Sequence, residues 1–205
     1  MNRLFVAMIG LIPVVFLSSC GPFTNKVEGS YQKVIPIANI VKLEIDSTSE
    51  NTVIKQGSSD RIELIIKFSA HAGNLKFAEK ILQEISQTIS QSLPLFVEDD
   101  TVRVGSIQED IRKFLPKRGF CIFFSSCTYI SVSYELKIPV NIAINYSSIS
   151  GNTNIENISG KIKVDVQSAN IKLQQTNGIV QISSNSGNIF ERTLVLYSLI
   201  QSTAI

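Results

Sequence analysis

The sequence is poor in the residues that most often build catalytic and metal sites. Its 205 residues include one histidine and three cysteines, only 18% are charged, and the formal net charge is +2. His71 has no neighbouring cysteine or second histidine with which to hold a metal ion, and no nucleophile signature accompanies it. The small positive charge is not gathered into a basic face, so nothing indicates a nucleic-acid partner. We therefore expect no metal, no cofactor and no enzymatic activity.

The first 19 residues are predicted to be a targeting segment. A short basic start is followed by an apolar run over 4–16, which is too short for a stable transmembrane helix. The run closes with Leu17-Ser18-Ser19-Cys20, which resembles the lipobox of bacterial lipoproteins. The resemblance implies cleavage before Cys20 and acylation of its thiol, which would anchor the chain in a membrane. The alternative is an ordinary secretory leader that is cut elsewhere.

The residues that follow Cys20 bear on its location and on the start of the folded domain. Gly21 comes next, and by resemblance to lipoproteins of bacteria with two membranes it favours the outer membrane. Residues 20–33 are rich in Gly, Pro and small polar residues at their start and show no periodicity, so we expect a tether there. The domain itself is expected to span 34–205.

Residues 150–189 repeat themselves every nine positions. The blocks SGNTNI, SGKIKV, SANIKL, NGIVQI and SGNI begin at 150, 159, 168, 177 and 186. Each block is a turn pair followed by alternating apolar and polar residues, which predicts a short strand. The apolar positions should face a core. The opposite positions form a candidate interaction face or a plain solvent-facing surface: Asn154, Lys163, Lys172 and Gln181.

Upstream of the repeats, alternation predicts strands over 40–45, 52–55, 61–68, 95–97, 101–104, 133–138 and 141–146. One segment differs, because apolar residues recur at helical spacing over 74–90, with Asn74 as an N-cap. We expect this amphipathic helix to pack on the sheet. Residues 107–117 read as a charged surface loop, and His71 as an exposed residue in the loop before the helix.

The run YELKIPVNIAINYSSISGNTNIENISGKIKVDVQSANIKL, residues 134–173, resembles the putative-adhesin family of bacterial cell-envelope proteins. The resemblance implies a mainly β fold, a β-solenoid or prism-like stack of short strands. The repeat pattern stops after Ile189, and residues 190–205 keep neither the turn pair nor clean alternation. This tail either caps the open end of the stack or is out-of-frame sequence, and its apolar residues are Leu194, Leu196, Leu199 and Ile200.

Cys121 and Cys127 remain once Cys20 is assigned to lipid. In an exported chain they favour a disulfide that closes a small loop, although two buried free thiols, or a pairing with another molecule, stay open. The repeats do not match calcium-binding nonapeptides, because Asp165 is the only acid in a comparable position.

These features together predict a lipid-anchored envelope protein with a non-catalytic, adhesin-like binding or interaction domain, whose partner would be an envelope or surface protein or glycan. One alternative is an envelope-stress sensor or regulatory scaffold. A less favoured alternative is a carbohydrate-active β-helix enzyme that uses acids such as Asp99 and Asp100.

Overall fold

The computed structural model describes residues 25–37, 39–113, 129–192 and 197–202. Within these ranges the chain forms two seven-stranded mixed sheets and two helices, so the mainly β prediction is confirmed. None of the described helices is long and apolar enough to cross a membrane. Cys20, Cys121 and Cys127 lie outside the described residues, and their lipidation and disulfide stay predictions.

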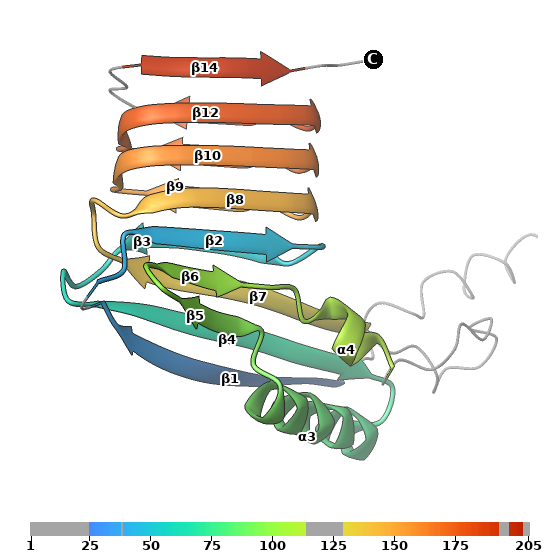
Figure 1. The fold of residues 1–205 in the computed structure, drawn as a ribbon. Helices are drawn as coiled ribbons and strands as arrows, with labels where there is room; N and C mark the ends of the chain where they lie inside the picture. Colours follow the sequence, from blue (N-terminus) through green and yellow to red (C-terminus); the bar gives the residue numbers. More distant parts are fainter. Residues whose placement is uncertain (1–24, 38, 114–128, 193–196, 203–205) are drawn as a thin grey trace, which may run out of the picture.

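The first sheet, called sheet A, runs from an antiparallel edge to a parallel edge (Figure 1). β1 pairs antiparallel with β4 and β4 with β7, whereas each later pair is parallel. In spatial order its strands are β1 (Asn25–Pro36), β4 (Arg61–Ala72), β7 (Tyr129–Ile138), β3 (Asn51–Gln56), β9 (Thr153–Glu156), β11 (Ile171–Gln174) and β13 (Ile189–Arg192).

The second sheet, sheet B, is parallel except for one hairpin at its edge. The acidic turn over 98–100 closes that hairpin, with Asp99 at a φ of 51°. In spatial order the strands are β14 (Tyr197–Ser202), β12 (Asn177–Ser186), β10 (Ser159–Ser168), β8 (Ala143–Ser150), β2 (Lys42–Ser47), β6 (Thr101–Val104) and β5 (Leu95–Glu98).

Consecutive nine-residue blocks enter different sheets. In sheet B, Ile162 pairs with Val180, and in sheet A, Ile171 pairs with Ile189, so the chain returns to the same sheet every 18 residues. The strands stack in two columns toward β14 in Figure 1. The apolar positions predicted from the repeats are all buried: Thr153, Ile155, Ile162, Val164, Ile171, Leu173, Val180 and Ile182.

The predicted helix is confirmed as α3 (Leu75–Gln91). The Asn74 side chain accepts a hydrogen bond from the Lys76 backbone N–H at 2.9 Å, which satisfies one of the free donors of the first turn. The helix packs on β1 and β4 through one buried stripe (Figure 1), made of Ala78, Ile81, Ile85 and Ile89.

Part of the predicted tether is a strand. Residues from Asn25 onward form β1, which pairs with β4 over its whole length. Val27, Tyr31 and Ile35 pack toward the core, but Gly29 and the exposed Lys33 interrupt their alternation and hide the strand in the sequence. Glycine is required there because a Cβ at position 29 would lie 2.6 Å from a ring carbon of Phe68.

Two further predictions are corrected by the structure. The loop expected over 107–117 contains a short helix, α4 (Gln108–Arg112), seated by buried Ile107 and Ile111. His71 lies in β4 instead of a loop. The stacking also continues after Ile189, since Tyr197 of β14 pairs with Ile179 of β12 at the same 18-residue offset. Leu199 and Ile200 lie in β14, whereas Leu194 and Leu196 lie outside the described residues.

Candidate functional site

The four residues of the predicted interaction face do not form one surface. Asn154 of β9 is in register with Lys172 of β11 on sheet A, whereas Lys163 of β10 is in register with Gln181 of β12 on sheet B. The reason is the 18-residue return: blocks nine residues apart turn into opposite sheets. The structure therefore brings these residues together as two separate pairs.

The pair on sheet A lies beside a ladder of asparagines. Asn170 Nδ2 donates to Asn152 Oδ1 at 3.0 Å, and the Asn188 backbone N–H donates to Asn170 Oδ1 at 3.1 Å. At the start of the ladder, the Asn152 backbone N–H donates to Asn51 Oδ1 at 2.9 Å. These contacts hold exposed amides at neighbouring strands, which lie about 4.8 Å apart in a sheet.

The asparagine ladder borders a hollow of about 430 Å³ on the outer face of sheet A. Phe190 of β13 is in register with Lys172, and 57% of its surface is exposed. The hollow therefore combines amides that donate and accept hydrogen bonds, one ammonium group and one aromatic ring. We call it the amide hollow, and its lining is Asn51, Thr52, Val53, Asn152, Thr153, Asn154, Asn170, Lys172, Asn188 and Phe190.

The sequence contained a signal for the residues that the repeat pattern alone missed. Asparagine occurs at 152, 170 and 188, whereas Lys161 and Ile179 stand at the intermediate positions of the nine-residue series. This recurrence at 18 residues marks the sheet to which the asparagines belong. Phe190 is the next member of the series that begins at Asn154, but it lies in the part expected to depart from the repeat.

Of the pair on sheet B, Lys163 lines a smaller and more charged hollow of about 250 Å³, whereas Gln181 does not. Glu44 there forms ion pairs with Lys42 and with Arg103, the latter at 2.9 Å, and the hydrogen bond from Lys42 lowers the pKa of Glu44. Lys163 and Asp165 are exposed on the same strand. This hollow carries charges of both signs and no exposed aromatic side chain. It therefore offers a ligand fewer kinds of contact than the amide hollow does. Its lining is Glu44, Asp46, Asn145, Tyr146, Ser147, Lys163 and Asp165.

The central part of sheet A carries two carboxylates that are each shared by two basic side chains. Glu135 of β7 accepts from Lys55 at 2.5 Å and from Lys67 at 2.6 Å, and these hydrogen bonds lower the pKa of Glu135 to about 2. Next to it, Glu63 pairs with Arg61 at 2.9 Å and with Lys137 at 3.4 Å. This ion-paired region lies between β1 and the strands of the amide hollow.

The buried carboxylate of Glu50 accepts hydrogen bonds from several segments of the chain. Glu50 is fully buried, and one of its oxygens, Oε2, accepts from Ser47 Oγ at 2.8 Å and from the backbone N–H groups of Thr48 and Ser49 at 2.9 and 3.0 Å. The other oxygen, Oε1, accepts from Ser106 Oγ at 2.6 Å, the Ile107 backbone N–H at 3.1 Å and the Tyr134 hydroxyl at 3.3 Å.

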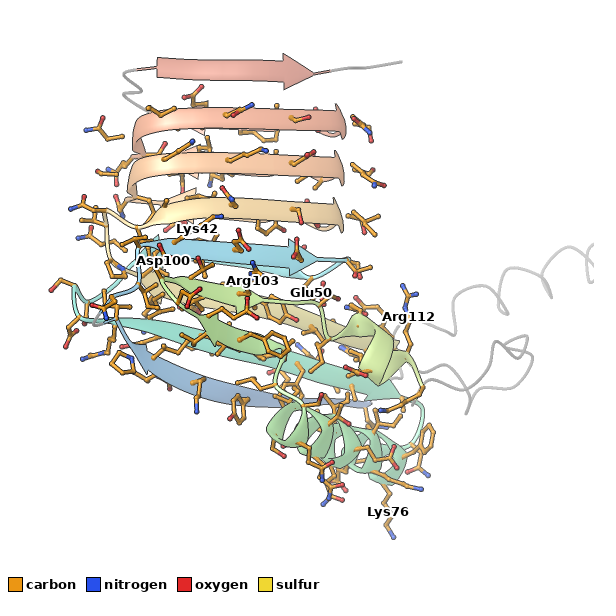
Figure 2. All side chains as sticks on the ribbon, viewed as in Figure 1. Lys42, Glu50, Lys76, Asp100, Arg103 and Arg112 are labelled. Carbon is orange, nitrogen blue, oxygen red and sulfur yellow. The ribbon has the colours of Figure 1, made fainter. Side chains whose placement is uncertain are left out.

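The environment of Glu50 explains its charge state. Burial alone would raise the pKa of Glu50, but the hydrogen bonds from Ser106, Ser49 and Ser47 outweigh it and leave the pKa below its usual value. Burial and the Glu50 charge raise the pKa of the Tyr134 phenol. In Figure 2 Glu50 lies beside β2, within the body of the fold. All six of these hydrogen bonds are internal, so the group stabilises the fold and does not reach a substrate.

The acids proposed for the enzyme alternative lie in the open β5–β6 turn. Glu98, Asp99 and Asp100 are exposed, Glu98 pairs with Arg103 at 3.2 Å, and the Asp100 carboxylate accepts from Thr101 Oγ1 at 2.9 Å. Catalytic carboxyl pairs need a cleft in which one pKa is raised. All three of these carboxylates are instead exposed to solvent. Across the described ranges there is also no group of three or more His, Cys, Asp or Glu that could hold a metal ion.

The similarity of this chain to known proteins is confined to solved structures. No protein-family model matches the sequence, and no curated protein matches it. A crystal structure of a putative cell adhesion protein from Clostridium sporogenes is similar over 86% of this chain and 99% of its own, with 9% identity and a TM-score of 0.37. A putative adhesin from Parabacteroides merdae is similar over 86% and 97%, with 7% identity and a TM-score of 0.24. TM-scores this low do not show a common fold, so neither name is transferred.

Proposed function

We propose that this chain is a lipid-anchored, non-catalytic binding module of the bacterial cell envelope, with the amide hollow as its contact surface. The observation that supports this most directly is the combination of exposed asparagine amides with the exposed ring of Phe190 in one hollow. We also propose that β8 to β14 form a two-sided β-solenoid, since their partners recur every 18 residues in both sheets.

A glycan is the ligand class that this chemistry fits best. Sugar hydroxyls both donate and accept hydrogen bonds, as carboxamides do, and the C–H face of a pyranose ring can lie on an aromatic ring. Lys172 adds one positive charge beside Phe190, which would favour an acidic sugar. Of the two hollows, the one on sheet A provides these groups without internal ion pairs, and the adhesin-like role would follow from glycan attachment.

The binding test uses the mature, detergent-solubilised protein on an array of envelope and host glycans. Phe190→Ala removes the ring and should weaken binding by about 2- to 10-fold, because an aromatic contact contributes about 0.5–1.5 kcal/mol. Phe96→Ala is the matched control, since Phe96 is also an exposed phenylalanine on an edge strand, but of sheet B, and is 61% exposed. Binding by Phe96→Ala should match the wild type.

Two results would contradict the ligand assignment. Equal losses in Phe190→Ala and Phe96→Ala would show that the hollow is not the contact surface. Absence of any glycan binding, together with capture of one envelope protein by mild crosslinking, would favour the sensing or scaffold alternative instead.

The anchor is tested separately by intact mass and membrane fractionation of the wild type and of Cys20→Ala. We expect acyl mass on the wild type alone, in the outer membrane if the source has two membranes. A soluble wild type with the same mass additions as the variant would remove the anchor from the proposal.

A further inference from the structure

We propose that the corner of the fold where β1 begins is a membrane-docking surface, so that the lipid-anchored domain rests on the bilayer in one orientation. This inference depends on the proposed anchor at Cys20. The surface, called the docking corner, consists of Leu75, Phe77 and Tyr129, with Lys76 beside them.

Four chain segments meet at the docking corner. Asn25, the first residue of β1, is in register with Ala72 at the end of β4, and its Nδ2 donates to the Gly73 carbonyl at 3.2 Å. β4 leads directly through Asn74 into α3, and β7 begins beside it because His71 is in register with Tyr129. Figure 1 shows the start of β1, the end of β4 and the start of α3 at the same end of the molecule.

The docking corner exposes large apolar side chains. Leu75 is 47% exposed, Phe77 is 40% exposed and Tyr129 is 62% exposed. The Tyr129 ring meets His71 edge-on, with ring centroids 5.6 Å apart, which orients the tyrosine at the end of the sheet. An aromatic ring with a polar tip is typical of the interface between lipid and water.

The charge at the docking corner suits an anionic lipid surface. The Lys76 ammonium group has no partner among the described residues, and in Figure 2 its side chain points away from the body. The first turn of α3 holds no acidic residue. A basic residue close to an anionic membrane is attracted to its surface.

The short chain between Cys20 and β1 indicates that the bilayer is what covers the docking corner. Only five Cα–Cα steps join Cys20 to Asn25, and an extended chain covers at most about 18 Å over that distance. A lipid on Cys20 would thus hold Asn25 close to the headgroups. Asn25 adjoins Ala72 and Gly73, which lead into the docking corner, so a bilayer held at Asn25 would cover it.

This orientation also separates the membrane from the amide hollow. β1 and β13 are the two edges of sheet A, six strand spacings apart, which corresponds to about 29 Å. Docking through β1 and α3 therefore carries Phe190 away from the bilayer, where a ligand can reach it.

The test uses single tryptophans, because the chain contains none of its own. Phe77→Trp places the reporter in the docking corner, and Phe190→Trp places a chemically matched reporter at the opposite edge of sheet A. Both acylated proteins are reconstituted into phosphatidylcholine–phosphatidylglycerol vesicles with and without brominated lipid. We expect bromolipid to quench the emission of the Phe77→Trp protein, with a blue shift on vesicle binding, and to leave the emission of the Phe190→Trp protein unchanged.

The outcomes separate this inference from the proposed anchor. If the Phe77→Trp protein carries acyl mass and floats with vesicles but its emission is not quenched, the docking corner is wrong and the anchor stands. If neither acyl mass nor flotation is seen, the anchor fails and the inference with it. If the emission of the Phe77→Trp protein is already blue-shifted in detergent and depends on protein concentration, a second copy covers the corner and the lipid assignment is overturned.

Discussion

Replacing Glu50 by Gln tests whether the buried carboxylate stabilises the fold through its charge and its geometry. The two side chains have nearly the same shape, so the change leaves the packing intact and exchanges one oxygen for an NH2 group. All six groups around Glu50 are donors in the native structure. An amide cannot accept from all of them.

The cost depends on which way the new amide points. If the NH2 group replaces Oε2, it faces the backbone N–H groups of Thr48 and Ser49, which cannot change from donor to acceptor. If it replaces Oε1, the hydroxyls of Ser106 and Tyr134 can rotate to accept, and the Ile107 N–H loses this acceptor but keeps the Tyr134 hydroxyl at 3.1 Å. The second orientation is cheaper. One weakened buried donor and the loss of charge from the bonds that remain give about 2–4 kcal/mol of destabilisation.

Thermal unfolding followed by circular dichroism measures this loss. For a domain of this size, 2–4 kcal/mol corresponds to a decrease in Tm of about 4–16 °C at pH 7. Glu79→Gln, at an exposed position on α3, is the control and should leave Tm within the effect of an ordinary surface substitution, about ±0.5 kcal/mol.

Acidification provides a second readout with a defined sign. The pKa of Glu50 is lowered in the folded state from an ordinary value of 4.5, so its ionised form stabilises the protein above pH 4.5. This contribution is lost as the pH falls below 4.5 through the folded-state pKa. The Tm difference between the wild type and Glu50→Gln should therefore narrow in acid. A Glu50→Gln protein as stable as the wild type at pH 7, or a Tm difference that does not change with pH, would refute the reasoning.

Two further predictions concern a turn and a surface ion pair. Gly178 has a φ of 122°, and a Cβ there would lie 2.3 Å from the Gly160 carbonyl oxygen, so Gly178→Ala should destabilise by about 1–3 kcal/mol or more in urea unfolding. Gly105→Ala, whose Cβ would find its nearest neighbour at 3.8 Å, should be neutral; equal losses in both would contradict the steric argument. Glu135 has a pKa of about 2 in place of 4.5, so its ionised form stabilises the protein above pH 4.5, and this contribution is lost as the pH falls from 4.5 through 2. Glu135→Gln should flatten that part of the Tm–pH curve, and an unchanged curve would show that the ion pairs do not stabilise the fold.

The helix was predictable because one local pattern determines it. Ala78, Ile81, Ile85 and Ile89 recur at helical spacing, and Asn74 supplies the cap, so neighbours in the sequence carry all the information. β1 was not predictable in the same way. Its partner β4 is distant in the sequence, and two positions of the inward series are not apolar: Gly29, where Phe68 occupies the space of a side chain, and the exposed Lys33.

The candidate site shows where a repeat can mislead. Alternation tells which residues point inward, and it does so equally well for both halves of an 18-residue unit, since a strand looks the same in either sheet. The two halves differ in which side chains stack on one another at the outer face of their sheet. Asparagines at 152, 170 and 188 can bond to one another only when they stack in the same column, as the 3.0 Å contact between Asn170 and Asn152 shows. A side chain that forms a hydrogen bond with the equivalent residue of the next repeat therefore indicates the true period, which is 18 residues. A face predicted from the nine-residue spacing combines residues that lie on two different sheets.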